Sequence, residues 1–154
     1  MSVEIRRAAA DDLDRARRFY LGRGYGGGIR PEDTVLLAEQ DGQLAGIVRL
    51  AREHGAVVLR GMQVDPAFQR RRIGTRLLAV IADELGERDC YCIPYAHLVE
   101  FYGQIGFRPI EPDDAPAFLA ERIEEYRGRA NGKEYLLMHR PGRSAPAGTP
   151  REDA

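Results

Sequence analysis

Residues 59–78, LRGMQVDPAFQRRRIGTRLL, decide the fold of this chain and carry its chemistry. The first part, up to Val64, completes an apolar run that predicts a strand over residues 56–64, and Pro66 ends that strand. The second part opens a long amphipathic helix, predicted over residues 74–86. The most informative part of the sequence is therefore a strand that leads through a basic loop into a helix.

The loop before this helix combines several arginines with a glycine at a helix N-terminus. Amide N–H groups converge at a helix start, and the helix dipole adds partial positive charge. Gly74 lets a ligand approach the backbone closely, and Arg70, Arg71 and Arg72 add formal charge. These are the properties of a pyrophosphate site. A solvated basic loop whose glycine serves only the turn explains the same residues equally well.

Charge and motif content exclude several other functions. The sequence contains neither a Gly-x4-Gly-Lys-Ser/Thr loop nor a GxGxxG fingerprint. A net charge of −1 and arginines without interleaved aromatic residues argue against a nucleic-acid partner. No run approaches the ~18 apolar residues of a membrane span, and the N-terminus lacks an apolar signal core. We therefore expect a cytoplasmic protein without membrane association.

The cysteines and histidines predict no metal site. Cys90 and Cys92 are separated by one residue, and His54, His97 and His139 are scattered along the sequence. If residues 89–93 form a strand, both thiols point to the same face, where a disulfide would be strained. We interpret the two cysteines as small buried hydrophobic residues in a reducing compartment.

Hydrophobic periodicity along the rest of the chain predicts alternating strands and helices, and hence an α/β fold with a mixed sheet. Asp11 and Asp12 are expected to cap a first helix, which the glycines of residues 22–28 end. A hairpin turn is expected at Asp41 and Gly42. The further strands are expected over residues 3–8, 34–39, 43–50, 89–93 and 135–139, and the further helices over residues 98–104 and 113–127. A length of 154 residues predicts one domain, over residues 1–140, followed by a disordered tail over residues 141–154.

Two stretches together resemble the GNAT acetyltransferase superfamily. Residues 59–78 resemble its acyl-CoA-binding core, whose signature is Gln/Arg-x-x-Gly-x-Gly/Ala, and residues 101–107, FYGQIGF, resemble its Phe-Tyr-x-x-x-Gly-Phe element. Their order and separation also match, and the alternation of elements over residues 3–139 follows the family's fold. The resemblance implies a GNAT-type acyl-CoA N-acyltransferase fold with splayed central strands.

The resemblance also implies the site. Pantetheine would lie between the strand ending at Val64 and the strand beginning near Cys90. Tyr102 matches the tyrosine that protonates the departing thiolate, and a phenol suits this role because its unperturbed pKa is near 10. Packing beside Phe101 and Phe107 is the structural alternative for Tyr102. The residues expected to bind acetyl-CoA are Met62, Gln63, Val64, Gln69, Arg70, Arg71, Arg72, Ile73, Gly74 and Thr75.

The sequence departs from the family pattern at three points. Arg72 stands in place of the first signature glycine, and Tyr95 stands where many members have an asparagine. Many relatives carry a glutamate on the strand before the signature, but residues 56–64 contain no carboxylate. We expect His97 to act as the catalytic base, since its unperturbed pKa is near 6.5. The alternatives are local packing of His97, a water chain, or one of Glu53, His54 and Glu100.

The leading hypothesis is direct transfer of an acetyl group from acetyl-CoA to a primary amine. The acceptor, a small molecule or a peptide, would be selected by residues 22–31 and 110–132. A non-catalytic acyl-CoA sensor or interaction module on the same fold is the alternative, and an adaptor without a cofactor pocket is a third hypothesis. An exposed last strand would suit a homodimer, although the tail or charged residues can equally cover such an edge.

Overall fold

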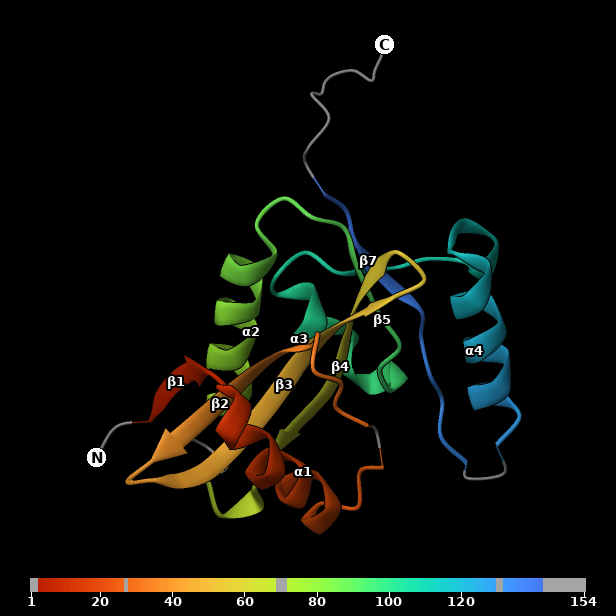
Figure 1. The fold of residues 1–154 in the computed structure, drawn as a ribbon. Coiled ribbons are helices and arrows are strands. Elements are labelled where there is room, and N and C mark those ends of the chain that lie inside the picture. Colours follow the sequence, from red (N-terminus) through yellow and green to blue (C-terminus); the bar gives the residue numbers. More distant parts are fainter. Residues whose placement is uncertain (1–2, 27, 69–71, 130–131, 143–154) are drawn as a thin grey trace. The chain divides into compact units, whose positions relative to one another are not determined.

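The computed structural model describes residues 3–26, 28–68, 72–129 and 132–142. They form two compact units, Met1–Glu53 with Val58–Glu84 and His54–Val57 with Leu85–Ala154. Strands and helices alternate along the chain, so the fold is mixed α/β, as the sequence predicted (Figure 1). One domain over residues 1–140 stays a prediction, and the disorder predicted for the tail falls, from residue 143 onward, outside the described residues.

The first unit is built on four neighbouring strands in the order β1-β2-β3-β4. β2 pairs antiparallel with β1 and with β3. Asp41 (φ 54°) and Gly42 (φ 79°) form the hairpin turn between β2 and β3, which confirms the predicted turn. Left-handed conformations at both central positions give the turn the twist of the flanking strands. The strands are β1 (Glu4–Arg7), β2 (Thr34–Gln40), β3 (Gln43–Glu53) and β4 (Ala56–Val64).

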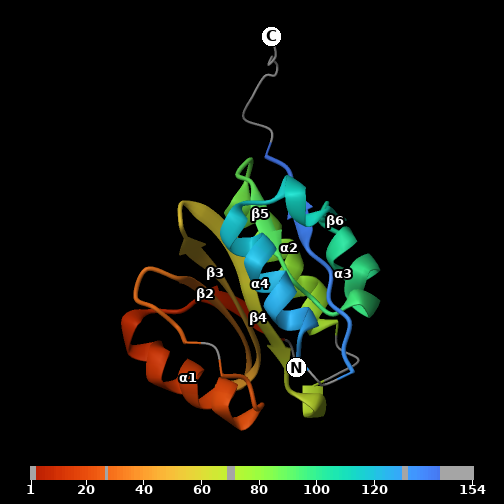
Figure 2. The same ribbon diagram turned by 90° about the vertical axis from the view of Figure 1, so that its right-hand side faces the viewer.

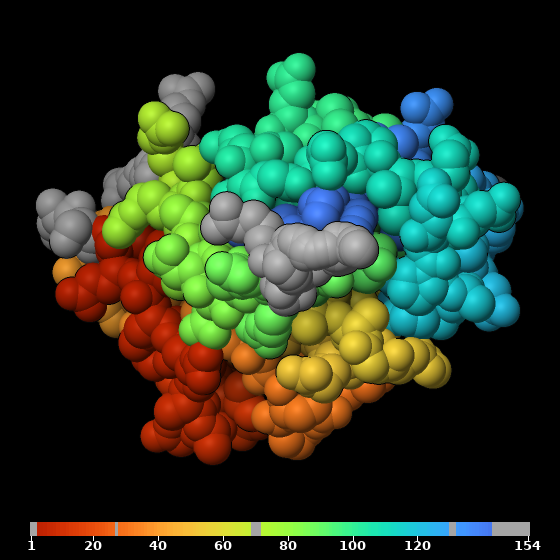
Figure 3. Space-filling model, turned by 90° about the horizontal axis from the view of Figure 1, so that it is seen from above, coloured from red at the N-terminus to blue at the C-terminus, as the bar shows by residue number. Residues whose placement is uncertain are grey.

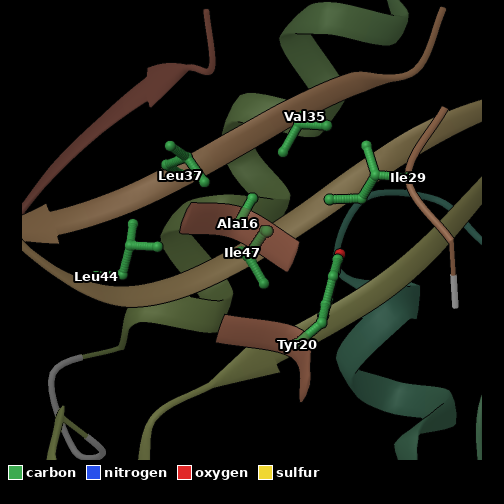
Figure 4. Close-up of a cluster of buried hydrophobic side chains, with 7 residues drawn as sticks. All are labelled: Ala16, Tyr20, Ile29, Val35, Leu37, Leu44 and Ile47. Atoms are coloured by element: carbon green, nitrogen blue, oxygen red, sulfur yellow. The ribbon is translucent and has the colours of Figure 1, made fainter. Parts of the chain in front are cut away.

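Two helices cover opposite faces of these strands. From α1 (Leu13–Gly22), Ala16 and Tyr20 pack against buried residues of β2 and β3, including Leu37 and Ile47 (Figures 2 and 4). On the other face lies α2 (Ile73–Leu85), and a Cβ atom at Gly46 would be 3.0 Å from its Ile73 Cγ2. The glycine therefore lets α2 pack directly onto β3.

The start of α1 differs from the prediction. Asp12 makes no side-chain capping bond to α1. Its carboxylate instead accepts a hydrogen bond from the backbone N–H of Ala9 at 2.8 Å and pairs with Arg6, which also pairs with Glu39. Asp12 is the last residue of a preceding 3₁₀ helix, η1 (Ala10–Asp12), and its helical backbone (φ −86°, ψ −13°) is not the extended conformation typical of an N-cap residue. Asp12 thus ties α1 to β1 and β2 instead of capping the helix.

The second unit holds three short antiparallel strands in the order β5-β7-β6. Cys90 and Cys92 are buried free thiols on β5, as predicted. The strands are β5 (Cys90–Cys92), β6 (Arg108–Pro109) and β7 (Met138–Arg140), and the helices are η3 (Ala96–Leu98), α3 (Val99–Gly103), η4 (Pro112–Asp114) and α4 (Ala117–Arg127).

Two predicted elements of this unit have different bounds. The helix predicted over residues 113–127 is divided, because Pro116 forces Ala115 into an extended conformation (φ −112°, ψ 162°) between η4 and α4. The last strand was predicted over residues 135–139, but β7 comprises Met138–Arg140, and Tyr135 forms only an isolated bridge with Tyr95. The two-residue strand β6 was not predicted at all.

The turn between β3 and β4 is exposed and is yellow in Figure 3. Its residues His54 (φ 49°) and Gly55 (φ 81°) repeat the left-handed pair of the first hairpin. Within the described residues, no helix is long and apolar enough to cross a membrane.

Candidate functional site

β4 contains a left-handed residue, Gly61, and such a residue inside a strand bends it locally. This residue has a φ of +67°, a left-handed conformation inside a strand, and the residues from Arg60 to Val64 are only half buried. The hydroxyl of Tyr20 on α1 donates a hydrogen bond to the carbonyl oxygen of Gly61 at 2.8 Å. A glycine in a strand interior marks a place where the backbone bends or another group approaches closely. Here the group that approaches is a buried tyrosine.

Beneath Gly61 lies a group of buried and half-buried residues that we call the Arg49 cluster: Tyr20, Tyr25, Asp33 and Arg49. Nε of Arg49 is 3.2 Å from Oδ2 of Asp33, and their side chains are 2% and 1% exposed. Cζ of Arg49 is 5.6 Å from the ring centroid of Tyr20 and 5.8 Å from that of Tyr25. Among the described residues, Nε and Nη1 of Arg49 and Oδ1 of Asp33 have no partner with hydrogen-bond geometry. The charged pair is thus held mainly by its own attraction and by two aromatic faces.

The cluster was not predicted from the sequence. Arg49 is the one charged residue within the apolar run LAGIVRLA of residues 44–51, and this was the available signal. Burial raises the pKa of Tyr20 well above its ordinary value, although the positive charge of Arg49 opposes the shift. The Tyr20 hydroxyl therefore keeps its proton at neutral pH and remains a donor to Gly61.

After β4 the chain turns sharply toward α2. Asp65 pairs with β3, its N–H donating to the carbonyl of Ala45 at 2.8 Å. Its carboxylate accepts a hydrogen bond from the N–H of Ala67 at 2.9 Å, which closes a turn at η2 (Pro66–Phe68). Phe68 is buried and anchors this turn. The end of β4 is thereby fixed on both sides.

Arg72 stands immediately before α2 in a left-handed conformation, with a φ of +57°. Its carbonyl accepts a hydrogen bond from the N–H of Arg76 at 3.0 Å, which is the first hydrogen bond of the helix. A non-glycine residue in this region carries a steric cost, since its Cβ crowds the backbone. The chain therefore departs from the family signature in residue type but adopts a conformation that favours glycine.

The first turn of α2 combines a buried anchor with accessible residues. Ile73 is 2% exposed, whereas Gly74 and Thr75 are half buried. The guanidinium of Arg76 donates to the carbonyl of Val3 at 2.7 Å, which ties the helix start to the N-terminal segment. The predicted ligand residues Gln69, Arg70 and Arg71 lie outside the described residues.

In the second unit, Tyr102 belongs to α3 and is 5% exposed. Its ring meets those of Phe101 and Phe107 edge to face, with centroids 5.0 and 6.1 Å apart. The edge-to-face geometry orients the phenol within a tightly packed aromatic group. The packing role and a chemical role for Tyr102 are compatible, because packed neighbours hold a reactive side chain in one position.

An aromatic row crosses the surface of the second unit beside η3. The ring of Tyr95 stacks on that of His97, with centroids 5.9 Å apart, and makes a tilted contact with that of Tyr135 (5.2 Å). The ring of Tyr135 also contacts that of Tyr126 (5.0 Å). His97 is exposed, and Nζ of Lys133 lies 5.5 Å from the centroid of Tyr95. The η3 segment is therefore held by rings from α4 and from the chain before β7.

The alternative bases have different surroundings. Glu53 is 5% exposed, and its Oε2 accepts from Nη1 of Arg60 at 3.1 Å, which makes this carboxylate part of an ion pair. The ring of His54 packs on Phe118, with centroids 4.6 Å apart, and Glu100 is exposed on α3. No group of three or more histidine, cysteine, aspartate or glutamate side chains within the described part of the chain is arranged to hold a metal ion.

The site residues thus fall into two sets. The first unit holds Met62, Gln63 and Val64 at the end of β4, together with residues 72–75 at the start of α2. The second unit holds His97 on η3 and Tyr102 on α3. Met62, Gln63 and Val64 lie together on β4 in the first unit, and His97 and Tyr102 lie on consecutive helical segments in the second.

Solved structures have the same fold. The ribosomal-protein-S18-alanine N-acetyltransferase of Escherichia coli is 18% identical, with a TM-score of 0.70 over 97% of this chain and 99% of that chain. An acyl-CoA N-acyltransferase from Pseudomonas aeruginosa is 18% identical, with a TM-score of 0.63 over 90% and 98%.

A longer protein also matches. N-acetylglutamate synthase from Neisseria gonorrhoeae, complexed with coenzyme A and N-acetyl-glutamate, is 23% identical, with a TM-score of 0.63. The match covers 91% of this chain but only 35% of the synthase, so this chain spans about a third of that protein. A search of curated protein sequences finds no match.

The family model described as the acetyltransferase (GNAT) domain matches residues 31–109, which is more than half of the chain. The matched residues include β4, the left-handed Arg72, the start of α2 and Tyr102, the elements on which the resemblance was based. The chain belongs to the GNAT acetyltransferase family.

Proposed function

We propose that this protein transfers an acetyl group from acetyl-CoA directly to a primary amine. The observation that carries the proposal is the junction between β4 and α2. There a half-buried strand end leads into a helix whose first residue follows a left-handed Arg72. Free amides at a helix start bind phosphate groups, and a strand with accessible backbone groups can pair with the amides of pantetheine.

The residues present fit acetyl-CoA as a substrate. Gly74 and Thr75 are half buried in the first turn of α2, so amides and a hydroxyl are available to a pyrophosphate. The backbone groups of Met62 and Val64 would bind pantetheine, with Gln63 between them. Gln69, Arg70 and Arg71 would add charge and hydrogen bonds at the phosphates, as would Arg72 and Ile73 through their backbone.

The reaction requires a base, a stabilised oxyanion and an acid. The neutral amine attacks the thioester carbonyl, forming the C–N bond, and the C–S bond then breaks. The departing sulfur takes a proton from the hydroxyl of Tyr102, and His97 accepts the proton that the amine loses. A backbone N–H near Val64 would stabilise the oxyanion. We assign the acid role to Tyr102 because it matches the tyrosine of the family motif, and the base role to His97 because it is an exposed imidazole in the same unit.

A thermal-shift titration with acetyl-CoA tests the first half of the proposal. At 100 times the dissociation constant, binding stabilises the fold by about 2.7 kcal/mol, or roughly 5–10 °C for a chain of this size. The shift should disappear in an Arg70→Ala/Arg71→Ala/Gly74→Val variant. It should persist in Arg18→Ala/Arg52→Ala, which removes the same charge from exposed positions elsewhere. No shift in the wild type would refute the proposal.

Release of free thiol with a panel of amines tests the second half. Tyr102→Phe keeps the ring and its packing, so we expect turnover to fall about 100-fold while affinity for CoA stays the same. Turnover equal to that of the wild type would remove Tyr102 from the mechanism. CoA binding without thiol release for any amine would instead favour a non-catalytic acyl-CoA sensor.

Three finer points stay predictions. The acceptor is a small-molecule or peptide amine selected by residues 22–31 and 110–132. The protein acts in the cytoplasm, and it forms a homodimer. The last strand was expected to be an exposed edge, but within the described residues β7 pairs with both β5 and β6, so it has no free edge there for a partner strand.

A further inference from the structure

We infer that Tyr20 is a positioning residue: its hydroxyl, held by the Arg49 cluster, fixes the bend of β4 at Gly61 and so sets the backbone groups of Met62 and Val64 for acyl-CoA. This inference rests on the proposed function, because it assigns acyl-CoA to the end of β4. It adds a residue that contacts neither substrate.

The contact between Tyr20 and β4 is close and specific. Besides the 2.8 Å hydrogen bond to the carbonyl of Gly61, a Cβ atom built at Gly61 would lie 2.3 Å from Oη and 2.8 Å from Cζ of Tyr20. The same Cβ would lie 3.0 Å from Nη1 of Arg49. The phenol and the guanidinium therefore occupy the space that a side chain would need, and β4 bends over them.

Tyr20 itself has little freedom to move. It is 1% exposed, and its ring lies 4.7 Å from that of Tyr25 and faces the guanidinium of Arg49. Asp33 neutralises Arg49 from the loop before β2. The backbone N–H of Tyr25 also donates to the carbonyl of Tyr20 at 2.9 Å. Side chains locked by packing and charge in this way can hold a neighbouring backbone in one geometry.

The bend governs the residues that follow it. In a strand, successive residues alternate between faces, and a left-handed residue shifts this alternation for the residues beyond it. Three residues after Gly61 the strand ends, and Asp65 is fixed to the carbonyl of Ala45. Met62, Gln63 and Val64 thus lie between two fixed points, Gly61 and Asp65. The orientation of their N–H and C=O groups depends on both.

The test compares Tyr20→Phe with Tyr25→Phe. Each removes one hydroxyl from the same ring pair, but only Tyr20 bonds β4. We expect the dissociation constant of CoA, measured by calorimetry, to rise about fivefold in Tyr20→Phe, because a factor of five corresponds to the net free energy of one hydrogen bond. In Tyr25→Phe the dissociation constant should change less than twofold. The KM for acetyl-CoA should rise more than kcat falls.

Two further readouts separate positioning from general stability. Urea unfolding gives the stability of both variants, and a role in stability alone would lower it without changing CoA affinity. Amide resonances of Gly61 to Val64 in the ligand-free protein should move in Tyr20→Phe and not in Tyr25→Phe. If the wild type binds CoA and Tyr20→Phe binds it equally well, with these resonances unmoved, this inference is wrong. If the wild type does not bind CoA, the proposed function fails and the inference fails with it.

Discussion

Gly61→Ala should be among the most damaging single substitutions in the first unit. Two costs add at this position. The backbone has a φ of +67°, where an L-residue loses roughly 1–2 kcal/mol. The new Cβ would also lie 2.3 Å from Oη of Tyr20, a distance that real Cβ atoms do not show. Either the strand or the buried tyrosine must move.

The size of the second cost follows from what surrounds Tyr20. Moving its ring breaks the hydrogen bond to Gly61, worth about 1 kcal/mol, and overpacks a buried region, which costs about 1–3 kcal/mol. The total loss in the free energy of unfolding is therefore about 3–6 kcal/mol, a large part of the roughly 5–15 kcal/mol that stabilises a typical domain.

Gly24 supplies the matched control. It has a similar φ of +74°, but a Cβ there meets nothing within 4 Å. Gly24→Ala should therefore lose only the conformational cost, roughly 1–2 kcal/mol. Urea unfolding of both variants, followed by circular dichroism, measures the difference. Equal losses of stability in Gly61→Ala and Gly24→Ala would refute the reasoning, because they would mean that Tyr20 can move aside with no further loss in the free energy of unfolding.

Three further outcomes are expected. Arg72→Gly should raise the free energy of unfolding by roughly 0.5–1 kcal/mol, because relief of the left-handed strain exceeds the entropy cost of glycine. The control Arg18→Gly, inside α1, should lower the free energy of unfolding. If both variants lose stability, Arg72 is not strained. Arg6→Gln should make stability less sensitive to acid, because hydrogen bonds from Arg6 lower the pKa of Asp12 and of Glu39. That stabilisation is present above a pH of about 4 and is lost as the pH falls through the lowered pKa values, so unfolding curves at pH 6 and pH 3 should differ less in the variant. Tyr102→Phe should reduce thiol release and leave the dissociation constant of CoA unchanged, and a matching loss of CoA affinity would point to a packing role instead.

Local sequence chemistry predicted much of the fold. β4 has the predicted bounds, because a β-branched and apolar run ends at a proline. Asp41 and Gly42 form the predicted turn, because these residue types tolerate positive φ. The GNAT family, too, was recognisable from two short motifs. In each case the signal lies within a few consecutive residues.

What the sequence did not predict depends on contacts between distant residues. Arg49 interrupts an apolar strand, but the partner Asp33 and the facing Tyr20 come from other elements. The capping role of Asp12 was mispredicted for a similar reason, because Arg6 on β1 competes for its carboxylate. The conformation of Arg72 was also beyond the sequence, since an arginine gives no local signal for a positive φ.

Lys133 contacts the face of Tyr95 and is the chain's single lysine among 23 basic residues. An acetyltransferase can also acetylate its own amino groups. In an assay with a panel of amines, this self-acetylation releases thiol and hides the signal of slowly acetylated substrates. In this chain the background is confined to one exposed side chain and the N-terminus. Intact-mass and peptide mapping can therefore count it directly, and Lys133→Arg removes the side-chain contribution while keeping the charge beside Tyr95. Because the chain has a single lysine, a screen for the proposed acceptor would have little self-acetylation to subtract.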